Sequence, residues 1–204
     1  GKQVMEMVER DITARDIFTR EAFLNAITVD MAIGGSTNTV LHLMAIANQA
    51  NVKITLDDFD RIANSTPQLS KLSPSSTQHI NELHEAGGIP ALMKQLLDAG
   101  KIEGSLMTVT GKTVAENVAG AVVKDRNIIH DFDNAYSETG GLAVLVGNLA
   151  PDGAVVKQGG VAKEMLQHSG PARVYNSEEE AFAAITGNEI HSGDVVVIRY
   201  EGPK

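Results

Sequence analysis

The 204-residue sequence predicts an α+β chain in two parts, mainly helical over residues 1–127 and β-rich over residues 128–204. Two observations predict this division. Apolar side chains recur at three- and four-residue spacing through most of the first part, as on amphipathic helices. Near residue 128 this pattern gives way to short runs rich in β-branched residues, separated by turn residues. The second part has too few expected strands to close a sheet, so we expect it to need segments beyond residue 204.

Capping residues and glycines set the bounds expected for the helices. Thr19 and Thr55 are expected N-caps, and Glu21 suits the first turn because the helix dipole favours an acid there. Pro90 suits a first helical turn, and Gly100 suits the position just past a helix end. These signals predict helices at residues 3–10, 19–33, 37–49, 55–66, 77–86, 90–99 and 113–123.

Alternating or continuous apolar runs between turn residues predict the strands. Ser177 begins a strong capping box, which predicts a helix that ends at Gly187. Residues 142–146 are apolar throughout, as expected of a buried strand. The strands are expected at residues 68–72, 105–110, 142–146, 154–157, 173–175 and 195–200.

Composition excludes several classes of protein. The formal net charge is −9 and no basic patch stands out, which argues against nucleic acid or an anionic membrane as a partner. Cysteine is absent, so the chain itself has no disulfide, thiol nucleophile or cysteine-ligated metal. No apolar run is long enough to span a bilayer, and there is no signal-peptide pattern. A cytoplasmic location is therefore expected.

The candidate site is the segment between the second and third expected helices, which we call the glycine turn. It consists of Gly34, Gly35, Ser36, Thr37 and Asn38. Two glycines let a backbone approach a ligand closely, and a helix start presents free N–H groups to an anion. The alternative interpretation is a tight helix–helix turn with a polar N-cap. The residues alone favour this structural alternative.

Other polar segments have simpler explanations. Residues 111–113 read Gly-Lys-Thr, but the upstream glycine of a phosphate-binding loop is missing at position 106. No pair of histidines has a metal-site spacing, although His42 follows Asn38 by one helical turn. The polar loop at residues 134–141 is interpreted as a connector.

Six segments in order along the chain are distinctive: residues 29–43 (VDMAIGGSTNTVLHL), 86–91 (AGGIPA), 108–117 (TVTGKTVAEN), 136–143 (YSETGGLA), 147–157 (GNLAPDGAVVK) and 199–204 (RYEGPK). Together they resemble the dihydroxy-acid dehydratase and 6-phosphogluconate dehydratase family over nearly the whole chain. Residues 39–41 and 199–201 resemble the dihydroxy-acid branch more than the phosphogluconate branch.

The resemblance implies a hydro-lyase that converts a 2,3-dihydroxy acid to a 2-keto acid in valine and isoleucine biosynthesis. The family uses an iron–sulfur cluster as Lewis acid for the leaving hydroxyl group, a magnesium ion to hold the carboxylate and hydroxyl groups, and a serine alkoxide as base. It also implies a homodimer. Residues 1–127 would be the end of an N-terminal α/β domain, and residues 128–204 the incomplete start of a C-terminal, β-barrel-like swivelling domain.

The chain departs from the family pattern at the catalytic groups. It has no cysteine for the cluster, and the family's magnesium ligands and serine base lie outside the matching segments. We therefore expect an internal fragment that is inactive alone, with no catalytic or metal-binding residue and no bound cofactor. Only the glycine turn remains as a candidate to bind the small dihydroxy acid. A sugar-acid dehydratase and a non-enzymatic binding module stay open as alternatives.

Overall fold

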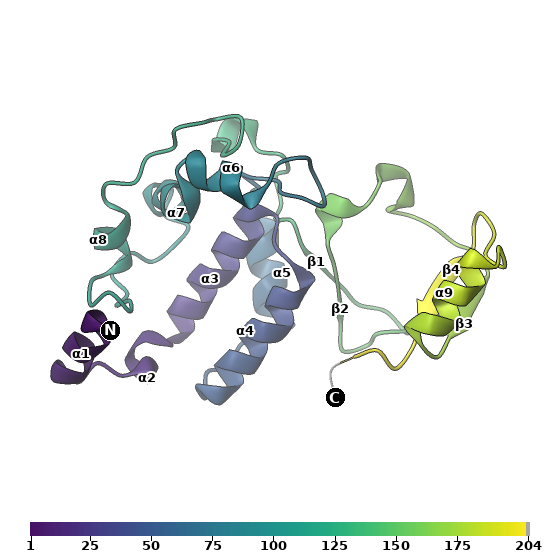
Figure 1. The fold of residues 1–204 in the computed structure, drawn as a ribbon, viewed down its shortest axis with the longest axis horizontal. Helices are drawn as coiled ribbons and strands as arrows, with labels where there is room; N and C mark the ends of the chain where they lie inside the picture. The colour runs from purple at the N-terminus through teal and green to yellow at the C-terminus, as the bar shows by residue number, and fades with distance from the viewer. Residues whose placement is uncertain (203–204) are drawn as a thin grey trace. The chain divides into compact units, whose positions relative to one another are not determined.

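The computed structural model describes residues 1–202, which pack as two compact units. The first runs from Gly1 to Gly160, and the second begins at Val161. Pro203 and Lys204, the end of the last segment that carries the family resemblance, lie outside the described residues. The two units are described separately (Figure 1).

The first unit contains a helical body and one small sheet (Figure 1). β1 and β2 pair antiparallel, with Val144 opposite Val155. The helices are α1 (Lys2–Glu9), α2 (Ala14–Ile17), α3 (Arg20–Ile33), α4 (Thr37–Gln49), α5 (Leu56–Ser65), α6 (Ile80–Glu85), α7 (Gly88–Asp98) and α8 (Val114–Val118), and the strands are β1 (Ala143–Leu145) and β2 (Ala154–Val156).

The caps expected for α3 and α5 are confirmed. Thr19 Oγ1 accepts a hydrogen bond from the Ala22 N–H at 3.2 Å, which begins α3. Asp58 closes a capping box by accepting from the Thr55 N–H at 3.1 Å, and it also binds Arg20 Nη2 at 2.6 Å. Burial by itself would raise the pKa of Asp58, but these hydrogen bonds, with Arg61, lower it overall. Asp58 is thus accounted for as a structural carboxylate that joins α3 to α5.

Two apolar clusters form the core of the first unit, and α3 contributes to both. The predicted buried face of α3 is confirmed, since Ile27 and Met31 are at most 1% exposed. One cluster joins α3, α4, α5 and the residue just before β1, through Phe23, Ile27, Met31, Val40, Ala47, Ile54, Phe59, Ile62, Ala63 and Leu142. The other gathers around α6 and α7, through Ala32, Leu69, Leu83, Ala86, Ala91, Leu92, Leu96, Ile102, Val114 and Ile129.

Four expectations for local structure were wrong. Residues 68–72 and 105–110 form no strand, because each makes only one bridge, Gln68 to Ser137 and Met107 to Thr113. The helix expected to reach residue 123 ends at Val118. The strand expected to be buried is buried only at its start, since Val146 is 76% exposed. The two failed strands lack a continuous pairing partner, and Gly120 follows directly after the C-cap of the helix that ends early.

The second unit is a parallel strand pair with one helix. β3 (Ala172–Tyr175) pairs with β4 (Val195–Ile198), and α9 (Glu178–Thr186) lies between them in the chain. Ser177 caps α9 by accepting from the Glu180 N–H at 3.2 Å.

The mixture of helices with two-stranded sheets confirms the α+β class. Over residues 1–202 the strands form two separate pairs, and neither pair closes into a barrel. No helix in this range has the length and apolarity that crossing a membrane requires.

Candidate functional site

The glycine turn connects the end of α3 to the start of α4 in the conformation that its sequence predicts. Gly34 ends α3 in the left-handed region, at φ 84°, and Gly35 follows at φ 38°. Ser36 is the N-cap of α4, and its Oγ accepts from the Asn38 N–H at 3.3 Å. Ser36, Thr37 and Asn38 are exposed, whereas Gly34 is buried. The polar half of the turn is therefore accessible to a ligand, whereas Gly34 is packed inside and Gly35 is half-buried.

Glycine is required in the turn because neighbouring segments pack against its backbone. A Cβ atom at Gly34 would lie 2.4 Å from Gln68 Nε2. A Cβ atom at Gly141 would lie 2.4 Å from the Gly34 Cα atom. The two glycine segments, more than a hundred residues apart, thus touch backbone to backbone, and any side chain at Gly141 would separate them.

Three segments that are distant from the turn in sequence form the floor beneath it. The Leu69 N–H donates to the Ala32 carbonyl at 2.7 Å, and the Gly141 N–H donates to the Met31 carbonyl at 3.2 Å. These two bonds use carbonyl groups in the last turn of α3, and the Met31 carbonyl also accepts from the Gly34 N–H at 3.3 Å. The Gly159 N–H reaches the Gly141 carbonyl at 3.4 Å. The floor therefore depends on segments that the sequence interpretation treated as a strand and a connector.

Asp30, in the last turn of α3, lies directly beneath the glycine turn. It is 7% exposed, and its Oδ2 atom has no hydrogen-bond partner. A Cβ atom at Gly35 would lie 2.6 Å from that oxygen, so the carboxylate faces the backbone of the turn. Burial raises the pKa of Asp30 to about 6, while Thr39, the Ser36 backbone and the charge of Lys157 lower it in part. Asp30 is thus a buried titratable group in contact with the candidate site.

Sequence reasoning identified the turn but missed the groups around it. Asp30 could have been recognised from the sequence, because it is an acidic residue within the apolar stretch of α3. Gln68 and Lys157 had no local signal, since only the fold brings them to the turn. His42 is exposed on α4. Contact between the turn and a substrate stays a prediction.

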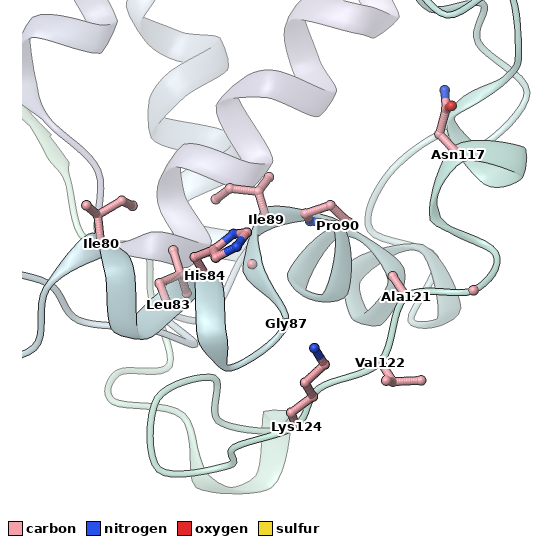
Figure 2. Close-up of a pocket in the computed structure, with 12 residues that line it drawn as sticks. Ile80, Leu83, His84, Gly87, Ile89, Pro90, Asn117, Ala121, Val122 and Lys124 are labelled. Carbon is pink, nitrogen blue, oxygen red and sulfur yellow. The ribbon is translucent and has the colours of Figure 1, made fainter.

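A separate hollow of about 640 Å³ lies at the start of α7. Figure 2 shows His84 and Lys124 on its wall, beside apolar side chains that include Leu83 and Pro90. Two segments with family resemblance, 86–91 and 108–117, contribute to it. No residue of the glycine turn lines this hollow.

The chain's own residues do not fit an iron–sulfur cluster. Such clusters are held by cysteine thiolates, and the sequence contains no cysteine. Over residues 1–202, no three histidine, aspartate or glutamate side chains are close enough together to hold a metal ion. The described residues therefore offer no ligand set for the iron–sulfur cluster or the magnesium ion.

Comparison with known proteins gives one consistent result. Residues 1–117 match the family model described as dihydroxy-acid/6-phosphogluconate dehydratase N-terminal, and residues 127–204 match the corresponding C-terminal model. Proteins named dihydroxy-acid dehydratase are similar over all 204 residues, at 60% identity in Moorella thermoacetica, 57% in Clostridium novyi and 56% in Caldicellulosiruptor saccharolyticus.

The chain spans 37% of the length of each of these relatives. The N-terminal model nevertheless matches the first part of the chain and the C-terminal model the second part. Together they leave only residues 118–126 unmatched. The chain belongs to the dihydroxy-acid/6-phosphogluconate dehydratase family.

Proposed function

We propose that this chain is part of a dihydroxy-acid dehydratase, a hydro-lyase that removes water from 2,3-dihydroxy acids to give 2-keto acids in valine and isoleucine biosynthesis. The observation that carries the proposal is identity of 54–60% over the whole chain to relatives with that name. The iron–sulfur cluster, magnesium ion and serine base that the family resemblance implies would come from segments outside these residues. The intact enzyme would be a cytoplasmic homodimer.

The domain organisation is part of the same proposal. Residues 1–127 would belong to the N-terminal α/β domain and residues 128–204 to the C-terminal swivelling domain. One observation supports this assignment. The β3–α9–β4 unit exposes large apolar side chains on both strands and on the helix, and a complete domain would bury such side chains. Val174, Phe182, Ile185 and Ile198 are each at least 43% exposed. A barrel-like domain completed by further strands would cover such side chains.

Within the enzyme, the glycine turn would orient the substrate. Ser36, Thr37 and Asn38 are exposed at the start of α4, where the helix dipole favours the carboxylate of a dihydroxy acid. The Ser36 hydroxyl and the Asn38 amide can also donate to substrate hydroxyl groups. The tight packing beneath the turn would keep these donors in place.

Replacing Ser36 or Asn38 by alanine in the full-length enzyme is expected to lower kcat/KM roughly tenfold, because each change removes one hydrogen bond to the substrate. The Ser36→Ala change also removes an N-cap, which costs about 1 kcal/mol of stability. Steady-state kinetics and thermal unfolding would be measured on the same preparations.

Ser177→Ala is the matched control, since Ser177 is also an N-cap whose hydroxyl accepts from a backbone N–H in the first turn of its helix. It should cost similar stability and leave turnover unchanged. If Ser36→Ala and Asn38→Ala change only the melting temperature, the glycine turn is structural. A sugar-acid dehydratase is distinguished by comparing turnover of a branched dihydroxy acid with that of 6-phosphogluconate, and a non-enzymatic module would turn over neither.

A further inference from the structure

Asp30 is a buried acid in the last turn of α3, and one of its carboxylate oxygens is unsatisfied and faces the start of α4. Its Oδ2 atom has no partner, although the residue is only 7% exposed. This oxygen faces Gly35, one residue before the N-cap of the 13-residue helix α4. An unpartnered buried polar atom costs free energy, so its retention needs an explanation beyond packing.

Hydrogen bonding alone does not explain an aspartate at this position. No hydrogen bond of normal geometry reaches Oδ2, but the nearby Thr39 side chain and Ser36 backbone still favour the ionised form of the carboxylate. An asparagine carbonyl could accept from the same groups without the cost of burying a charge. What aspartate adds is a charge that can be gained and lost.

The charge of Asp30 acts where an anionic ligand would bind. A helix start is equivalent to about half a positive charge, which a single nearby carboxylate can neutralise. An ionised Asp30 therefore cancels the attraction that the start of α4 offers to a second anion. A protonated Asp30 leaves that attraction intact.

We propose that Asp30 is a positioning residue that controls, through its charge, how strongly the glycine turn binds a carboxylate ligand. Ionised Asp30 supplies the anion that the start of α4 attracts, and protonated Asp30 leaves that place to the ligand. This inference rests on the proposed substrate-binding role of the turn.

The charged group that acts on Asp30 is Lys157, which follows β2. The other segments packed around the turn present Gln68, Ser70 and the glycine loop at Gly141, none of which titrates. Lys157 stabilises the ionised form of Asp30. Lys157→Gln should therefore raise the pH at which Asp30 ionises and ligand binding weakens. The pH dependence of ligand binding thus comes from the titration of Asp30, and the charge of Lys157 shifts it.

The test is binding of 2,3-dihydroxypropanoate, the simplest 2,3-dihydroxy acid, to the full-length enzyme at pH 5.0 and pH 7.5. Binding is followed through the backbone amide NMR signals of Gly35, Thr37 and Asn38. The wild-type dissociation constant is expected to be roughly tenfold lower at pH 5.0. The neutral amide of the same acid should show no such difference.

Asp30→Asn should bind the acid equally well at both pH values, at the affinity of the wild type at pH 5.0. Asp152→Asn, which removes an exposed carboxylate from the turn between β1 and β2, is the matched control and should behave as the wild type. Binding that does not vary with pH in the wild type, or that still varies in Asp30→Asn, overturns the role of Asp30 alone. No binding by either protein at either pH overturns the substrate-binding role of the turn as well.

Discussion

Replacing Gly141 by alanine is expected to lower the free energy of unfolding by about 3 kcal/mol. The new Cβ atom would lie 2.4 Å from the Gly34 Cα atom and 2.7 Å from the Gly34 carbonyl carbon and oxygen. These are backbone atoms at the end of α3, so they cannot turn aside as a flexible side chain could. Either the loop or the glycine turn must move, and the hydrogen bond from the Gly141 N–H to Met31 would be lost with it.

Gly147→Ala is the control for this prediction. Gly147 is exposed in the same region of the chain, and a Cβ atom there would meet no atom within 4 Å. Its replacement should change the unfolding free energy by no more than about 0.5 kcal/mol. Urea denaturation followed by circular dichroism gives both values. Similar results for the two variants would mean that the loop does not pack against the turn in solution.

Replacing Asp30 by asparagine is expected to stabilise the protein above pH 6, by up to about 3 kcal/mol. Burial raises the pKa of Asp30 to about 6 from its ordinary value of 3.8. Between these values the native state binds more protons than the unfolded state, so the contribution of Asp30 to stability falls as pH rises. That contribution is fully present below pH 3.8 and is lost above pH 6.

The measurement is the unfolding free energy of the wild type and of Asp30→Asn from pH 4 to pH 8. The difference between the two should grow with pH up to about 6 and then level off. Asp152→Asn removes an exposed carboxylate and should show no such trend. A difference that is constant over this range would show that Asp30 is not held with a raised pKa. A stabilising effect would also mean that aspartate is kept at a cost to stability, as residues at functional sites often are.

Elements with local capping signals were predicted closely from the sequence. The third expected helix runs over Thr37–Gln49, and the helix after Ser177 ends at Thr186. Their bounds depend on hydrogen bonds between residues three or four positions apart, which a sequence displays directly. The segments at 68–72 and 105–110 failed because a strand needs a continuous partner, and each of them makes only a single bridge, Gln68 to Ser137 and Met107 to the nearby Thr113.

The sequence by itself determined the bounds of the helices with clear capping signals, the α+β class, the family and the glycine turn as a candidate site. Only the tertiary structure decided what surrounds that turn. Asp30 acquires its raised pKa, and Gly141 its intolerance of a side chain, from contacts between segments far apart in the chain. Burial and close backbone approach are properties of packing in three dimensions, so no local pattern of residues could have specified them.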